Sequence, residues 1–169
     1  MIKYLHNKFM GVFFMDVTGE KGIGKILKII LQICFYTGIA SLIILPFVLN
    51  YFGFKLGASA FIVYPNGIVL LVITKQFIKL FDSLQRNTPF SEENVKTMKK
   101  AGITSFVGAI FWLLDLMYEI VLAKSDEIIF MVTLIFLCFL YLGVTVALYI
   151  LAELFKQAIE YKKENELTI

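Results

Sequence analysis

Four long apolar stretches dominate the pattern of hydrophobic and polar positions along the chain. They cover residues 27–50, 58–81, 103–123 and 128–151. Each matches the roughly 20 helical residues that cross about 30 Å of hydrocarbon. Inside a bilayer, a run of this kind satisfies its own backbone hydrogen bonds only as a helix. The pattern therefore predicts an all-α, polytopic membrane protein, a single domain over residues 1–169 in which four transmembrane helices form a bundle.

A different pattern follows the last apolar stretch. In residues 152–169, charged residues such as Glu153, Lys156 and Glu160 interleave with Phe155 and Ile159 at helical spacing. We expect the fourth helix to continue past the membrane surface as an amphipathic extension.

The segment between the second and third stretches, residues 82–94, carries turn and capping signals, and we call it the elbow. Pro89 disfavours helix at the residue before it, and Ser91 is a favourable N-cap. Glu92 and Glu93 then complement the dipole of a new helix. The elbow is therefore expected to end in a helix that leads into the third stretch.

The composition supports a bilayer environment. The 169 residues are 59% hydrophobic and 17% charged, whereas soluble domains average roughly 45–50% and about 25%. This excludes a disordered chain, a disulfide scaffold and a typical soluble enzyme domain. Cys34 and Cys138 lie in apolar runs without metal-ligand spacing, so they are interpreted as small hydrophobic residues.

The distribution of basic residues predicts the orientation. Fourteen of the sixteen Lys and Arg residues fall on one side of the four stretches, leaving Lys55 and Lys124 on the other. Because cytoplasmic loops are enriched in Lys and Arg, both termini and the elbow are expected to be cytoplasmic. The sequence predicts no cleaved signal in residues 1–14, and we expect this segment to be either an interfacial amphipathic helix or a poorly ordered tail.

Polar residues within the apolar stretches mark a candidate intramembrane site. Asp115 and Glu119 are four residues apart and share one helical face, and Asn66 can lie at a similar depth on the second stretch. A carboxyl group at mid-membrane must face the bundle interior, be protonated or have a partner. One interpretation is a polar cavity that binds a proton, a cation or a small cationic or peptide ligand. The other is an interhelical hydrogen bond between protonated Asp115 and Asn66.

Catalytic signatures are missing from the sequence. The single histidine, His6, precedes the first stretch, and there is no phosphate-binding glycine loop, zinc motif or Ser/His/Asp set. We expect no enzymatic activity and no cofactor. The basic residues follow the membrane face, so direct nucleic-acid binding is not expected. The expected partners are the bilayer and, for a chain with only four spans, further copies of itself.

The elbow Asn87-Thr88-Pro89-Phe90 with Asn94, and the ending from Ala152-Glu153-Leu154-Phe155 to Glu166-Leu167-Thr168-Ile169, resemble the bacterial membrane-protein family catalogued as domain of unknown function 2975. Members often have Gly at the position of Asn87 and Asp at that of Glu166. The resemblance implies four spans but no chemistry. Members are commonly encoded beside small helix-turn-helix regulators, which implies a membrane-linked regulatory partner.

Two functions are therefore expected. The first is a regulatory or sensory membrane protein that docks a cytosolic partner, such as a DNA-binding regulator, on its inner face. The candidate docking residues are Pro89, Phe90, Asn94, Glu153, Phe155, Glu166 and Leu167. The alternative is a small transporter or an immunity protein against a membrane-active peptide, which would use Asn66, Asp115 and Glu119.

Overall fold

The computed structural model describes residues 23–52, 60–86, 88, 90–123 and 128–167. The expected interfacial helix in residues 1–14 and the candidate residue Pro89 lie outside this part of the chain. In residues 166–167 the backbone is described and the side chains are not, so the docking roles of Glu166 and Leu167 stay predictions.

The described residues form four long α-helices. They are α2 (Ile23–Tyr51), α3 (Ala60–Gln85), α4 (Glu92–Tyr118) and α5 (Ile128–Leu167). A short π-helix, η1 (Glu119–Ala123), continues α4. Pro46 and Pro65 lie inside α2 and α3 without ending either helix. The all-α prediction is confirmed for these residues.

Three of the described helices are long and apolar enough to cross a membrane: Gly24–Tyr51, Glu92–Val121 and Ile128–Asn165. The most apolar window of the first has 0% of its residues buried inside the protein, and that of the last has 6%. Water cannot solvate such surfaces favourably, so their side chains require an apolar surrounding. By length and composition, these three helices are consistent with a membrane protein.

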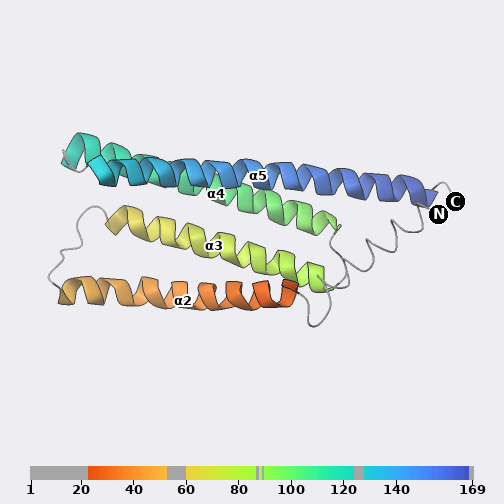
Figure 1. Cartoon of the computed structure of the whole chain (residues 1–169), viewed down its shortest axis with the longest axis horizontal. Helices are drawn as coiled ribbons and strands as arrows, with labels where there is room; N and C mark the ends of the chain where they lie inside the picture. The colour runs from red at the N-terminus through yellow and green to blue at the C-terminus, as the bar shows by residue number, and fades with distance from the viewer. Residues whose placement is uncertain (1–22, 53–59, 87, 89, 124–127, 168–169) are drawn as a thin grey trace.

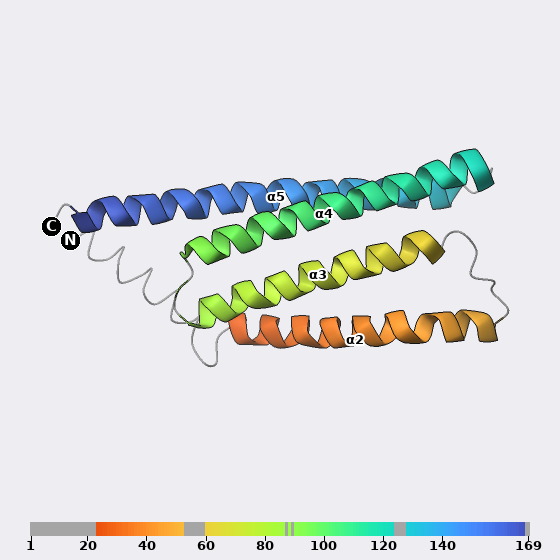
Figure 2. The same cartoon turned by 180° about the vertical axis from the view of Figure 1, so that it is seen from behind.

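The helices pack mainly with their neighbours in the chain. α2 packs on α3, α3 on α4, and α4 most extensively on α5. Both views show α2, α3 and α4 following one another across the molecule, with α5 alongside α4 (Figures 1 and 2). The expected bundle thus has the form of a row, with α2 at one edge. The elbow, the start of α2 and the end of α5 lie at the same end of the molecule, which we call the inner end.

Small residues allow α4 and α5 to approach closely. Ala101, Ser105 and Ala109 recur every four residues along α4 and are almost fully buried. Ser105 Oγ donates a hydrogen bond of 2.8 Å to the Tyr141 carbonyl oxygen of α5. At Gly108, an added Cβ would lie 2.4 Å from the Tyr141 ring. Small residues and interhelical hydrogen bonds of this kind hold helices together within membranes.

Candidate functional site: the inner face and an intramembrane carboxyl group

The elbow is held by a local hydrogen-bond network centred on Asn94. Its Nδ2 donates to Ser83 Oγ at 2.8 Å and to the Thr88 carbonyl oxygen at 3.2 Å. Ser91 has extended backbone angles and caps α4, because its Oγ accepts a hydrogen bond from the Asn94 N–H. The capping prediction is thereby confirmed. Asn94 is only 4% exposed, so its side chain shapes the elbow and offers a partner little surface.

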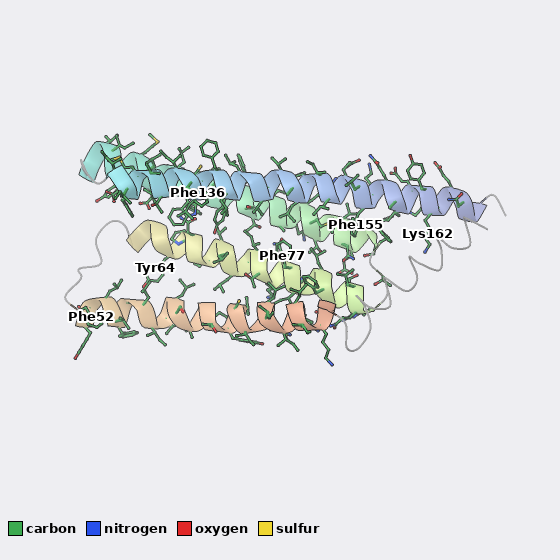
Figure 3. The ribbon with its side chains drawn as sticks, in the orientation of Figure 1. Phe52, Tyr64, Phe77, Phe136, Phe155 and Lys162 are labelled. Atoms are coloured by element: carbon green, nitrogen blue, oxygen red, sulfur yellow. The ribbon has the colours of Figure 1, made fainter. Side chains whose placement is uncertain are left out.

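An apolar cluster joins three helices at the inner end. It consists of Leu80 from α3, Val95 and Met98 from α4, and Ala152 and Ile159 from α5. Phe77 of α3 and Phe155 of α5 pack against the cluster (Figure 3). The cluster holds the polar end of α5 in place.

Phe90 and Phe155 are the two candidate docking residues that the structure brings into contact. Their ring centroids lie 5.1 Å apart, with the planes tilted by 44°. Phe90 remains 45% exposed. The elbow and the extension of α5 therefore form one continuous surface.

Ion pairs reinforce this arrangement. Lys163 Nζ of α5 lies 2.9 Å from Glu92 Oε1 at the start of α4. The hydrogen bond and the charge of Lys163, together with the charge of Lys96, lower the pKa of Glu92. Between α2 and α3, Lys28 Nζ forms an ion pair with Asp82 Oδ1 at 2.5 Å. The candidate residue Glu153 pairs only loosely within α5, at 3.9 Å from Lys156 Nζ.

The residues that the structure describes line two clefts on the inner face. The first, of about 340 Å³, lies over the elbow and is polar; its lining residues are Lys79, Asp82, Ser83, Arg86, Thr88, Ser91, Glu93, Asn94 and Thr97. The second, of about 290 Å³, lies between α4 and α5, and we call it the α4–α5 groove. Its lining residues are Glu92, Val95, Lys96, Lys99, Lys156, Ile159, Glu160 and Lys163.

The intramembrane candidates Asn66 and Asp115 are both buried, at 4% and 2% exposure. They lie on neighbouring helices, α3 and α4. The close approach of Val69 to Gly108 sets the antiparallel register, which places Asn66 level with residue 111. Asp115 is thus about 6 Å further along the helix axis.

Asp115 lies where α4 passes into the π-helix. The Glu119 N–H donates to the carbonyl oxygens of Asp115 and Leu116, and π-helical turns often mark functional sites. Asp115 Oδ1 is buried and has no hydrogen-bond partner among the residues that the structure describes. In that same part of the chain, no three His, Cys, Asp or Glu side chains gather closely enough to hold a metal ion.

A family model described as "Protein of unknown function (DUF2975)" matches residues 36–169. The chain belongs to the DUF2975 family. The resemblance expected from the elbow and the ending is thereby confirmed, and the match includes both clefts and Asp115. No curated protein and no solved structure matches the chain.

Sequence reasoning missed several features of this DUF2975 protein. The close α4–α5 interface at Ala101, Ser105 and Gly108 of α4 is one of them. The four-residue spacing of Ala101, Ser105 and Ala109 was the available signal. The α4–α5 groove carried no local signal, because its two sides are some sixty residues apart in the chain.

Proposed function

We propose that this DUF2975 protein is a non-enzymatic regulator in the bacterial cell membrane, which docks a cytosolic partner on its inner end. All four helices, α3 included, span the bilayer. The two termini and the elbow are cytoplasmic, as the distribution of Lys and Arg predicts. The partner that the family resemblance favours is a small helix-turn-helix transcription regulator.

The observation that carries the proposal is the length and support of α5. Its 40 residues extend about 60 Å at 1.5 Å per residue, about twice the hydrocarbon thickness of a bilayer. Its polar end contacts the elbow through Phe90 and Phe155, and the start of α4 through the Glu92–Lys163 ion pair. A helix that needed only to cross the membrane would not require this support.

The same contacts provide a route from the membrane to the inner face. α4 carries Asp115 within the bilayer and Val95 and Met98 at the inner end. A ligand or proton that changes the packing of Asp115 against α3 would shift α4 as a rigid helix. The elbow and the extension, which rest on α4, would move with it.

The test is affinity capture of the detergent-solubilised protein from its native host, with co-purifying proteins identified by mass spectrometry. Three chains are compared: the full chain, a chain ending at Lys163, and a chain ending at Ala152. The chain ending at Lys163 keeps the contacts to Phe90 and Glu92 and loses only the terminal residues.

We expect a small DNA-binding protein with the full chain and none with the chain ending at Ala152. If the chain ending at Lys163 still captures the partner, the groove-lining part of α5 carries the binding. If it does not, the terminal residues, Glu166 and Leu167 included, are required. A monodisperse elution profile of each chain verifies folding. Equal recovery of the same partner with all three chains would overturn the docking function.

A second function, transport or protection against a membrane-active peptide, is favoured by one observation. Asp115 is 2% exposed, and its Oδ1 lacks a hydrogen-bond partner among the described residues. Placing such a group within a membrane costs free energy, and ionisable residues found there usually have a function. Proton flux into liposomes that is lost in Asp115→Asn, and retained in Asn50→Asp at the end of α2, would favour transport over docking.

A further inference from the structure

Lysines predominate along the rim of the α4–α5 groove. Two come from α4 and two from α5, and they are accompanied by two glutamates. Val95 and Ile159, which form the floor, are already packed within the apolar cluster that joins the helices. A ligand of this groove therefore contacts the charged rim and gains little from the floor.

The two lysines of α4, Lys96 and Lys99, carry charge that no carboxylate balances at close range. Both glutamates of the rim are paired with lysines of α5, at 2.9 and 3.7 Å. Lys96 and Lys99 form no ion pair within 4.0 Å in the part of the chain that the structure describes. They are three residues apart, so they share a helix face, where like charges repel each other. An anion bound between them would remove this repulsion.

The depth of these two lysines favours the headgroup of a lipid. The hydrogen bond between Ser105 and Tyr141 sets the register of α4 and α5, which places Lys96 and Lys99 level with residues 147–150, where the last apolar stretch of the sequence ends. They also lie about 6–11 Å before the start of the third apolar stretch. The headgroup layer is about 5–8 Å thick on each side of the hydrocarbon. Long lysine side chains therefore reach its phosphates.

An exposed apolar stripe runs along α4 from these lysines toward the middle of the bilayer. Ile103, Phe106 and Ile110 continue the helix face of Lys99 at spacings of three and four residues, and each is 42–54% exposed. A phospholipid has the same arrangement, because its phosphate lies at the interface and its acyl chains extend into the hydrocarbon. This face of α4 thus matches a whole lipid, whereas a free phosphate would use the lysines alone.

We propose that Lys96 and Lys99 bind the phosphate of an anionic phospholipid, whose acyl chains lie along Ile103, Phe106 and Ile110. The lysines of α5 across the groove complete a basic site between two helices at the inner end. Basic pockets between membrane helices on the cytoplasmic side bind anionic headgroups in this way. The site requires no cytosolic partner, so it stands apart from the proposed docking function.

The experiment uses the full chain in micelles of an uncharged detergent, with equimolar phosphatidylglycerol and phosphatidylcholine of identical acyl chains. Native mass spectrometry gives the ratio of the two lipids that remain bound. The test variant is K96Q/K99Q, and K96R/K99R keeps both charges. The matched control is K75Q/K79Q, which makes the same charge change outside the groove, at two exposed positions of α3. Lys79 is level with residue 98 of α4 by the Val69–Gly108 contact.

We expect the protein to retain phosphatidylglycerol in preference to phosphatidylcholine. The preference should fall about 30-fold in K96Q/K99Q, which corresponds to about 1 kcal/mol per lysine. It should persist in K96R/K99R and in K75Q/K79Q. A monodisperse elution profile of each variant verifies folding.

An unchanged preference in K96Q/K99Q, or an equal fall in K75Q/K79Q, would overturn the proposal. Displacement of the lipid by millimolar glycerol phosphate would also overturn it and would assign the lysines to a soluble phosphate compound. If K96Q/K99Q kept the lipid preference but lost the partner captured from the host, the lysines would belong to the docking surface instead. Loss of the lipid preference with unchanged capture would support the lipid site and leave the docking function standing.

Discussion

The two ends of the helix row are held in different ways. α4 has a third of its most apolar window buried inside the protein, whereas the corresponding window of α2 has 0% buried. α4 meets α5 through hydrogen bonds to backbone carbonyl oxygens and through close ring contacts at glycine. α2 meets α3 through flexible contacts, such as Gly38 against the end of Leu71, and through the Lys28–Asp82 pair. Protein contacts thus fix the relative position of α4 and α5. The position of α2 is fixed less firmly by such contacts.

This difference suits the proposed function. The helices that form the inner groove are those whose mutual geometry is fixed by protein contacts. A docking surface requires such rigidity because its groups must keep their relative positions. An edge helix such as α2, whose most apolar window has 0% of its residues buried inside the protein, can adjust without changing that surface.

Gly108→Ala tests the α4–α5 unit with the largest expected effect. The new Cβ would lie 2.4 Å from the Tyr141 ring and 2.9 Å from Val69 Cγ1. Overpacking of this kind costs about 1–3 kcal/mol of unfolding free energy. Thermal unfolding in detergent micelles measures the loss. Gly143→Ala in α5 is the matched control, because nothing lies within 4 Å of its added Cβ. Equal stability of the two variants would refute the close packing.

Ser105→Ala removes the buried hydrogen bond between α4 and α5. Ser105 is 0% exposed, and its Oγ donates to the Tyr141 carbonyl oxygen at 2.8 Å. Interhelical hydrogen bonds within membranes contribute about 0.6 kcal/mol, and at most about 2. We expect a loss of that size in the same unfolding assay. Thr133→Ala, which removes an exposed bond within α5, should change stability less.

Lys28→Met tests how strongly α2 is attached at the inner end. It removes the pair with Asp82, in which both side chains are a quarter to a third exposed. Partly exposed ion pairs contribute up to about 1 kcal/mol, and salt screens them. We expect a small loss of stability at low salt that vanishes at high salt. A loss larger than that of Gly108→Ala would reverse the comparison between the two ends.

Acidification should loosen the end of α5 slightly. The pKa of Glu92 is lowered, first by its hydrogen bond with Lys163. The resulting stabilisation is complete above the ordinary pKa of a glutamate and is lost as pH falls through the lowered value. A fluorophore attached near Lys162 should therefore gain mobility in acid, and Glu92→Gln should be mobile at every pH. A response to pH that persists in Glu92→Gln would exclude this pair as its cause.

Features set by a few consecutive residues were predictable from the sequence. The cap at Ser91 and the helical extension after residue 151 follow from local chemistry and periodicity, and both agree with the structure. Burial of Asp115 and Asn66 follows from the cost of exposing polar groups to lipid, and both are buried.

Features set by pairing between distant segments were not predictable. Nothing near Phe90 indicates that Phe155 will contact its ring. Asn94 is a docking candidate on the strength of the family motif, and that motif gives no sign of the hydrogen bonds that its amide donates to Ser83 and Thr88. The α4–α5 groove depends on the register that Ser105 and Tyr141 fix, and only the assembled fold supplies that register.

The docking function requires the end of α5 to lie in the cytosol, and cysteine labelling tests this directly. Single cysteines are introduced by Tyr161→Cys and Ser125→Cys in a chain in which Cys34 and Cys138 are replaced by serine, and intact cells are treated with a membrane-impermeant maleimide. We predict labelling at position 125 in intact cells, and at position 161 only after the membrane is permeabilised. Labelling at position 161 in intact cells would contradict it.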